Sequence, residues 1–225
     1  MMPQLPVSAT WIYMMRSFSN QRTGILSLSD WITQEEKKFS ESGKVMMEKS
    51  RTEDMQPYCR ISRDFYIRDV LEVAPGIIGK NLVIVLHDDS VARYRISDVE
   101  AYRGYEDKAC HASKGKTPRT EVMFREGGHL YVYLIYGMYW MLNIVTGTED
   151  NPQAVLIRGL ANISGPGKVT KTLSIDRSYY GEDLVTSSRI WLENAGAAPE
   201  YKTSPRIGID YAGEYWKSRP WRYYI

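Results

Sequence analysis

Two segments rich in tyrosine and branched aliphatic residues flank Gly137, and they constrain the fold more than any other feature of the sequence. They run from His129 to Tyr136 and from Met138 to Thr146. Aromatic and β-branched residues favour strands, whereas glycine readily adopts the backbone conformations of tight turns. The pattern therefore predicts a β-hairpin with Tyr136 at its tip, and hence an antiparallel sheet around it.

Similar signals recur along the chain. A second hairpin is predicted from Asn81–His87 and Val91–Tyr102, which flank the turn residues Asp88-Asp89-Ser90. Further strands or extended pieces are predicted over Gln153–Arg158, Arg189–Glu193 and Pro205–Ile209. Three short helices are expected: one with an apolar face of Ile67, Val70, Leu71 and Ala74 that ends before Pro75-Gly76, one from Thr117-Pro118 to Gly127-Gly128, and one that opens at Gly165–Lys168. We therefore predict a single α+β domain with a curved, largely antiparallel sheet surrounded by short helices.

Residues 1–55 differ in character from the rest of the chain. They contain seven of the ten methionines, mixed basic and acidic residues, and little sustained apolar periodicity. A short helix over Asp30–Phe39 is the one element that this segment suggests. We predict a poorly ordered N-terminal extension over residues 1–55, followed by one folded domain over residues 56–225.

Composition limits the partners and the location. The formal net charge of +2 neither favours nor excludes nucleic acid, because a local basic patch can bind phosphates on a nearly neutral protein. The two cysteines and three histidines lack the spacing of metal ligands, so neither a metal nor a disulfide framework is expected. No apolar run approaches the roughly 18 to 20 residues that span a bilayer, and the N-terminus lacks a signal-peptide pattern. These features predict a soluble intracellular protein that does not bind membranes.

Three polar side chains share one face of the strand predicted over Val91–Tyr102. A spacing of two residues places Asp98, Glu100 and Tyr102 together on that face. Arg158 ends an apolar run in another predicted strand, where it needs an anion, and Glu100 is a candidate. An arginine that keeps a carboxylate ionised leaves it available as a base for water. The alternative is a purely structural ion pair.

The predicted hairpin tip carries an aromatic side chain that could contact a ligand outside the core. Tyr131 and Tyr133 lie on one face of the first strand, whereas Tyr136 at the tip has little to pack against. An exposed aromatic wedge suits insertion between base pairs, and an enzyme that acts on a base within a duplex must extrude that base into a pocket. The alternative is a core aromatic cluster, which fits Tyr131 and Tyr139 better than Tyr136.

Five segments, taken in order, carry a family resemblance: Val99–Tyr102, Tyr131–Tyr139, Leu142–Ile144, Leu156–Arg158 and Gly165–Lys168. From about Arg63 to the C-terminus the chain resembles the alkyladenine (3-methyladenine) DNA glycosylases. The resemblance implies that residues 56–225 form the catalytic domain of a monofunctional purine DNA glycosylase. Such an enzyme would act as a monomer, without a cofactor, on double-stranded DNA that contains damaged purines. It would work in the cytoplasm or nucleoid of a bacterium, or in the nucleus of a eukaryote.

The resemblance also implies roles for individual residues. Glu100 corresponds to the base that activates water, and Arg158 to the arginine that helps to position the carboxylate and that water. Four residues correspond to the pocket for the damaged base: Tyr102 and Tyr133 sandwich the flipped purine, His111 reads its edge, and Asn143 crowds the amino group of ordinary guanine. Tyr136 corresponds to the residue that fills the vacated stack. Contacts with backbone phosphates are expected from Thr117, Arg119 and Lys168. An alkylated purine is already cationic and leaves readily, so a base for water suffices.

Two departures from the family pattern qualify these expectations. Only six residues separate Arg158 from Gly165, where the family inserts a longer helical segment, and this gap could impair folding or activity. Pro75 falls where the first helix of the family continues, and it should shorten or kink that helix. The runner-up function is therefore a DNA-binding module of the same fold that has lost catalysis. A nucleoside hydrolase ranks last, because the sequence shows no aspartate cluster for calcium.

Overall fold

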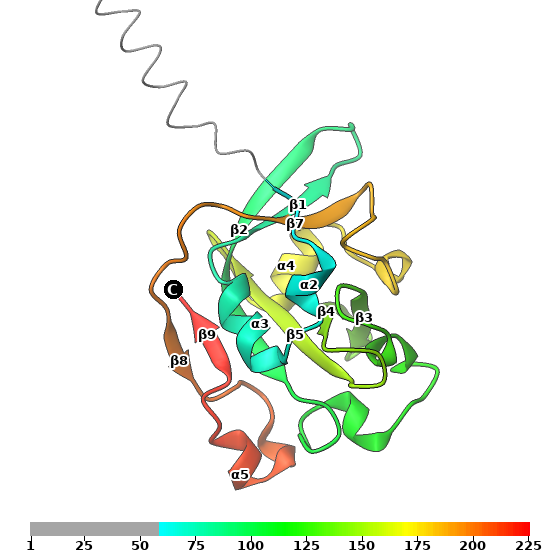
Figure 1. Cartoon of the computed structure of the whole chain (residues 1–225), viewed down its shortest axis with the longest axis vertical. Coiled ribbons are helices and arrows are strands. Elements are labelled where there is room, and N and C mark those ends of the chain that lie inside the picture. The colour runs from blue at the N-terminus through cyan, green and yellow to red at the C-terminus, as the bar shows by residue number, and fades with distance from the viewer. Residues whose placement is uncertain (1–58) are drawn as a thin grey trace, which may run out of the picture. The chain divides into compact units, whose positions relative to one another are not determined.

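The computed structural model describes residues 59–225, which form an α+β fold on one antiparallel sheet (Figure 1). Its nine strands are β1 (Asn81–Val85), β2 (Val91–Tyr102), β3 (Leu130–Ile135), β4 (Tyr139–Thr146), β5 (Gln153–Leu160), β6 (Ile163–Ser164), β7 (Ile190–Glu193), β8 (Lys202–Ser204) and β9 (Arg222–Tyr224). The helices are short: α2 (Arg63–Tyr66), α3 (Val70–Ile77), α4 (Pro166–Thr172), α5 (Glu214–Lys217) and the 3₁₀ helices η2 (His111–Lys114), η3 (Glu121–Phe124), η4 (Arg177–Tyr179) and η5 (Asp210–Ala212). The predicted fold class is confirmed. The predicted extension over residues 1–55 and its helix over Asp30–Phe39 lie outside the described residues.

The long strand β2 organises the sheet. The strand order is β3-β4-β5-β2-β1-β7, with β6 beside β5 and the pair of β8 and β9 beside β2. The first half of β2 pairs with β1, and its second half pairs with both β5 and β9. The register with β5 shifts between Ile96 and Val99, and such a bulge bends a strand and increases its twist. One strand thereby runs from the first hairpin into the middle of the sheet.

One face of the sheet is buried beneath helices. Val99 and Ala101 of β2, with Val155 and Ile157 of β5, lie on this face and have no exposed surface. Helix α3 packs on β2 and β5, and α4 packs on β4 and β5. Their apolar side chains join the same core: Val70, Val73, Ala74, Ile77, Val169 and Leu173. Because this face supplies the apolar burial that stabilises the fold, the opposite face is available for polar side chains.

The first predicted helix is divided in two. Asp69 caps α3, since its Oδ1 accepts a hydrogen bond from the Leu71 backbone N–H at 2.9 Å, and α2 ends before it at Tyr66. The expectation that the helix ends before Pro75 is wrong, because Pro75 lies in the last turn of α3. Proline removes one helical hydrogen bond, and α3 ends soon afterwards at Ile77. Pro75 thus sits in a short helix without breaking it.

Two other predicted segments differ from the structure. Thr117 does not open an α-helix: its hydroxyl accepts from the Thr120 backbone N–H at 3.3 Å within a turn, and the 3₁₀ helix η3 follows. Pro205–Ile209 is irregular and not an extended strand. The strand of this region is instead β8, which pairs with the unpredicted β9 at the end of the chain.

The short connection after Arg158 closes as a tight hairpin. Strand β6 folds back on β5, with Leu160 opposite Ile163, and Asn162 takes a positive φ of 66° in the turn. The Gly165 backbone N–H then donates to the Arg158 carbonyl at 2.9 Å, directly before α4. Few residues therefore suffice to join β5 to α4, which begins at Pro166 as its glycine-rich opening predicts.

Residues 59–225 contain neither a helix long and apolar enough to cross a membrane nor a group of three metal-ligating side chains.

Candidate active site

The face of the sheet opposite the helices carries most of the residues that the sequence singled out. Antiparallel partners lie on the same face of a sheet. The register joins Glu100 to Leu156, Leu156 to Asn143, and Asn143 to Tyr131. These residues form one row across β2, β5, β4 and β3, and Tyr133 occupies the next position on β3. Pairing thus gathers segments that are distant in the chain.

A cavity of about 870 Å³ opens over this row. Its aromatic and polar lining includes Tyr102, His111, Tyr131, Tyr133, Tyr136, Tyr139, Asn143, Arg158, Lys168 and Tyr211. Concave, mainly apolar cavities of this size with a few polar groups bind small planar ligands. The cavity can therefore accept an aromatic base.

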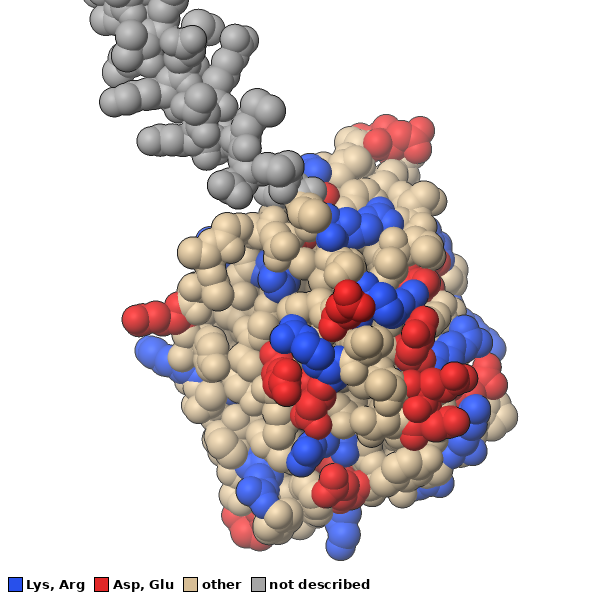
Figure 2. All heavy atoms as spheres, in the orientation of Figure 1, with Lys and Arg blue, Asp and Glu red and all other residues tan. Residues whose placement is uncertain are grey.

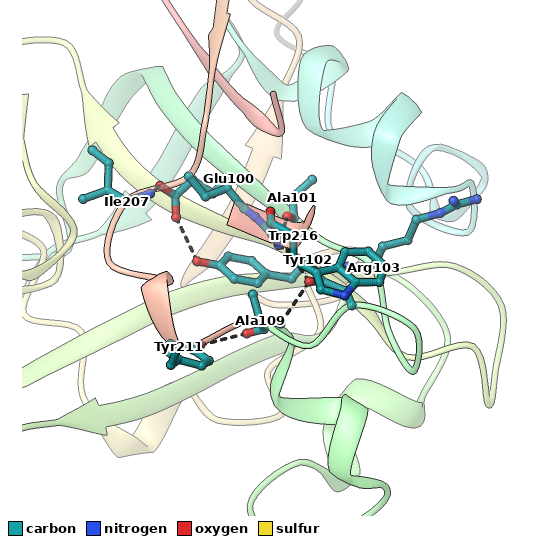
Figure 3. Close-up of polar contacts among 10 residues, drawn as sticks. Glu100, Ala101, Tyr102, Arg103, Ala109, Ile207, Tyr211 and Trp216 are labelled. Carbon is teal, nitrogen blue, oxygen red and sulfur yellow. Dashed lines mark hydrogen bonds and ion pairs between the residues drawn. The ribbon is translucent and has the colours of Figure 1, made fainter. Parts of the chain in front are cut away.

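Glu100 is fully buried behind Tyr102 and Arg158, which both line the cavity. The Tyr102 hydroxyl donates to Glu100 Oε2 at 2.8 Å, and the Ile207 backbone N–H donates to Oε1 at 2.8 Å (Figure 3). Arg158 Nη1 lies 3.3 Å from Oε1. The predicted contact between Glu100 and Arg158 is therefore confirmed, and two further donors act on the same carboxylate.

Opposing effects set the pKa of Glu100. Burial raises it and the nearby charge of Asp98 adds to the increase, while Arg158, the Ile207 N–H and the Tyr102 hydroxyl lower it. The net result is a pKa above the usual value for a glutamate. A carboxylate shifted in this direction is a stronger base than an ordinary glutamate, which favours proton abstraction.

Asp98 has a different partner. Arg222 on β9 donates from Nε to Oδ1 at 3.0 Å and from Nη2 to Oδ2 at 2.8 Å. Arg158 Nε is farther away, at 3.8 Å from Oδ2. Because a bidentate arginine holds a carboxylate in one geometry, the structural ion-pair interpretation fits Asp98. Glu100 and Tyr102 are the pair that adjoins the cavity.

His111 and two tyrosines form an aromatic cluster in the cavity wall. The Tyr133 ring centroid lies 4.7 Å from that of His111 and 5.1 Å from that of Tyr131. His111 Nδ1 is 2.8 Å from the Tyr131 hydroxyl. Burial, followed by the charges of Arg119 and Lys114, lowers the pKa of His111 to about 4. The imidazole is therefore neutral at pH 7, with one ring N–H to donate and one nitrogen to accept.

Asn143 is fixed within the sheet. Its Nδ2 donates to the Tyr131 carbonyl at 3.0 Å and to the Met141 carbonyl at 3.4 Å. Only 4% of the residue is exposed, on the cavity side. A side chain held in this way gives the cavity a rigid polar wall.

Tyr136 projects from the tip of the β3–β4 hairpin, as predicted. It is 82% exposed, and both Tyr136 and Gly137 have positive φ angles, 52° and 65°. Positive φ at successive residues matches the twist of a tight hairpin turn. The expectation that Tyr139 joins a core aromatic cluster is wrong, because it is 47% exposed beside Gly167 of α4. Tyr131 is buried, as expected.

The three predicted phosphate contacts line the cavity and are exposed. Lys168 lies in the first turn of α4. The Arg119 guanidinium lies over the Tyr133 ring, 4.9 Å from its centroid, and the Thr117 hydroxyl is 3.0 Å from that of Thr120. On the face shown in Figure 2, basic and acidic side chains are interspersed, in keeping with the small net charge.

The sequence matches a known protein family. A model described as methylpurine-DNA glycosylase matches residues 64–225. The chain belongs to the methylpurine-DNA glycosylase family. It is therefore a DNA repair enzyme that hydrolyses N-glycosyl bonds, and the family predicted from the sequence motifs is confirmed.

Curated relatives of this glycosylase carry the name "Putative 3-methyladenine DNA glycosylase". One from Methanocella arvoryzae is 46% identical over 184 residues, which cover 73% of this chain and 91% of the relative. One from Sodalis glossinidius is 48% identical over 158 residues, covering 66% and 89%. One from Natranaerobius thermophilus is 41% identical over 190 residues, covering 74% and 95%. The similarity thus extends over most of each relative.

Three contacts at this candidate site have no signal in the sequence. The Tyr131 hydroxyl meets His111, and the backbone N–H of Ile207 meets Glu100. Arg206 forms a buried ion pair with Asp107, 99 positions away. Residue type does not reveal a backbone donor, and no periodic pattern links an arginine to an aspartate so distant in the chain.

Proposed function

We propose that this chain excises alkylated and deaminated purines, such as 3-methyladenine and hypoxanthine, from double-stranded DNA. The damaged base flips into the cavity, and a water molecule activated by Glu100 hydrolyses the N-glycosidic bond. One observation carries this proposal: a fully buried carboxylate, paired with Arg158, lies beside an aromatic cavity. Ionisable groups with perturbed pKa values cluster at catalytic sites. The enzyme works as a monomer and without a cofactor.

The aromatic walls suit a flipped cationic purine. Tyr102 and Tyr133 offer ring faces on which the base stacks, and aromatic faces attract positive charge. His111, neutral at pH 7, does not repel such a base and reads its edge through Nε2, since Nδ1 faces the Tyr131 hydroxyl. Asn143 limits the space next to the base, which disfavours guanine with its extra amino group.

The reaction needs one base and no separate acid when the purine is alkylated. Glu100 takes a proton from water while the water oxygen attacks C1′ of the deoxyribose. The bond from C1′ to the purine nitrogen breaks, and its electron pair neutralises the positive charge of the base. An ordinary glycoside needs a second carboxylic acid to protonate its leaving group. A neutral lesion such as hypoxanthine lacks the positive charge and is expected to leave more slowly.

Tyr102 has two roles in this mechanism. In the free protein its hydroxyl donates to Glu100 Oε2 at 2.8 Å, and Glu100 has no exposed surface. Each carboxylate oxygen has two lone pairs, so a water molecule can bind Glu100 beside that hydroxyl when the base enters. Tyr102 therefore stacks on the base and holds the carboxylate that acts on it.

The rim of the cavity supports duplex binding. Tyr136 fills the gap that the flipped nucleotide leaves, while Thr117, Arg119 and Lys168 contact the phosphate backbone. Each basic contact releases a counterion, so affinity should fall as the salt concentration rises.

The test is a single-turnover assay with two duplexes, one carrying a single hypoxanthine and one methylated to contain 3-methyladenine. We expect abasic sites, seen as strand breaks at the lesion only after alkali treatment, and none in undamaged DNA. Breakage without alkali would contradict a purely hydrolytic mechanism. Tight binding of an abasic-analogue duplex without base release would favour the DNA-binding module instead.

A further inference from the structure

The C-terminal loop over residues 206–211 is fastened at two points to the segment 107–109. At one end, Arg206 Nη1 lies 2.5 Å from Asp107 Oδ2 and Nη2 lies 2.9 Å from Oδ1. At the other end, the Tyr211 hydroxyl donates to the Ala109 carbonyl at 3.1 Å (Figure 3). Between these ties, the Ile207 N–H donates to Glu100 at 2.8 Å. The Ile207 N–H therefore lies between the two ties along the chain.

The ion pair is deeply buried, and both Asp107 oxygens and both Arg206 Nη atoms are hydrogen-bonded, whereas Arg206 Nε has no hydrogen-bond partner among the described residues. Neither side chain has any exposed surface. Asp107 also accepts from the Arg103 and Ala109 backbone N–H groups at 3.1 and 3.0 Å, and Arg206 Nη1 donates to the Ala101 carbonyl at 2.9 Å. A buried ion pair often stabilises a fold no more than apolar residues would, and in some proteins it instead fixes one geometry. Here that geometry lies directly beneath the cavity.

Arg206 also supports the second donor to Glu100. Its guanidinium carbon lies 4.8 Å from the centroid of the Tyr102 ring and 5.0 Å from that of Trp221. Tyr102 in turn donates its hydroxyl to Glu100 Oε2. The same arginine thus adjoins both groups that hydrogen-bond the carboxylate: the Tyr102 ring directly, and the Ile207 N–H through the neighbouring peptide.

We propose that the ion pair of Arg206 and Asp107 positions the Ile207 N–H and the Tyr102 hydroxyl on Glu100, and so keeps this carboxylate ionised and correctly oriented. The inference rests on the proposed role of Glu100 as the base for water. A hydrogen bond donated to a carboxylate favours its ionised form and opposes the effect of burial. Arg206, Asp107 and Ile207 are positioning residues, since none of them needs to touch the reacting atoms.

Other titratable groups also act on Glu100. They come from each strand or loop around it: Asp98 and Tyr102 on β2, Arg158 on β5, Arg222 on β9, Tyr133 on β3 and Tyr211 in η5. A variant that removes only the Ile207 N–H leaves all of these groups unchanged. A shift in the pH profile of such a variant therefore reports on that one donor.

The experiment measures release of 3-methyladenine from methylated DNA under single-turnover conditions across a range of pH. This base is already cationic, so the acidic limb of the profile reports on Glu100 and not on protonation of the leaving group. Ile207 is replaced by its α-hydroxy acid, which retains the side chain and exchanges the N–H for an ester oxygen. We expect the acidic limb to move upward by about one pH unit, because a hydrogen bond to a charged group is worth about that much.

Three further substitutions keep the test decisive. Ile207→Pro removes the same N–H by a standard mutation. Ile207→Ala keeps the N–H and is the control: the acidic limb of its pH profile should stay at the wild-type pH, even if its maximal rate changes. Arg206→Lys retains the charge opposite Asp107, but it loses the second N–H donor to that carboxylate and the planar group that lies over the Tyr102 ring. The acidic limb of its pH profile should therefore also move to higher pH. Circular dichroism confirms that each variant is folded.

The outcomes separate this inference from the proposed function. Folded ester and Ile207→Pro proteins with an unshifted limb would overturn the role of the Ile207 N–H. An unshifted limb in folded Arg206→Lys would overturn the role of the ion pair. If Glu100→Gln, measured in parallel, kept the wild-type rate and limb, the proposed function of Glu100 itself would fail.

Discussion

The two faces of strands β2 and β5 show how adjacent residues serve opposite purposes. On one face, Val99 and Ile157 are fully buried beneath α3 and α4. On the other face, their neighbours Glu100 and Arg158 meet at 3.3 Å beside the cavity. A strand points successive side chains to opposite faces, so a single peptide unit separates the core from the candidate site.

The core and the candidate site are therefore held by different forces. The helix-covered face gains its free energy from apolar burial, which tolerates small changes of shape. The cavity face holds ionised groups whose burial is costly unless each has its partner. The free energy of unfolding should therefore respond mainly to substitutions on the helix-covered face, and the rate of base excision to substitutions on the cavity face.

Glu100→Gln should reduce catalysis more than any other substitution proposed for these two faces. Glutamine keeps the size of glutamate and one acceptor oxygen for the Ile207 N–H, but it does not accept a proton from water. Single-turnover excision should fall by roughly 10²- to 10⁴-fold. Folding should survive, because Asp98 still faces Arg158 at 3.8 Å, and affinity for abasic-analogue DNA should change little.

The rate, the melting temperature and the affinity are measured on one preparation of this variant, with Arg158→Met as its companion. A purely structural pair predicts another pattern, in which stability falls by about 3 to 5 kcal/mol and binding and excision decline together. Full activity of Glu100→Gln would exclude Glu100 as the base.

On the covered face, Ile157→Ala should act on stability alone. Ile157 has no exposed surface, and removal of so much buried side chain costs about 2 to 5 kcal/mol. Urea denaturation measures the loss, and excision per folded molecule should stay near the wild-type rate. A matched loss of excision by fully folded protein would show that the two faces are not independent.

At the hairpin tip, Tyr136→Ser should weaken binding to lesion DNA by about 1 to 3 kcal/mol, because an aromatic stack on the bases is lost. The tyrosine is 82% exposed, so its removal should leave the melting temperature unchanged. Fluorescence anisotropy measures the affinity, and Tyr136→Phe, which keeps the ring, is the control. A collapse of the fold would identify Tyr136 as a structural residue.

Much of this arrangement can be predicted from the sequence, because local patterns encode it. Period-two alternation gives the two faces of β2, and Tyr136-Gly137 gives the hairpin tip. Charge balance suggests Glu100 beside Arg158, since an arginine at the end of an apolar run needs an anion. These inferences depend on residue type and spacing alone.

The rest depends on contacts that local patterns do not encode. Strand β9 is short and pairs with β2 across more than a hundred positions, and its Arg222 takes Asp98 as its partner. The hydrogen bond to Glu100 comes from the backbone N–H of Ile207, so the type of residue at this position does not predict it. Tyr139 fits an aromatic core by composition, but it lies beside Gly167 at the start of α4 and remains about half exposed.

The smallest expected effect is the contribution of His111 to the pH dependence of stability. Burial and the nearby Arg119 and Lys114 lower its pKa to about 4 in the folded protein, against about 6.5 for an exposed histidine. The unfolded chain therefore binds the proton first, so this contribution to stability is complete above about pH 6.5 and is lost as the pH falls towards 4. His111→Gln does not titrate, and its unfolding free energy should depend less steeply on pH across that window.

Urea melts at successive pH values measure both slopes, and the exposed His87→Gln controls for the loss of one histidine from the unfolded chain. Identical slopes in the wild type and His111→Gln would mean that His111 takes up its proton in the folded cavity near neutral pH. A fraction of the rings would then be positively charged near pH 7 and would repel a cationic purine, and the proposed recognition of alkylated bases would need another explanation.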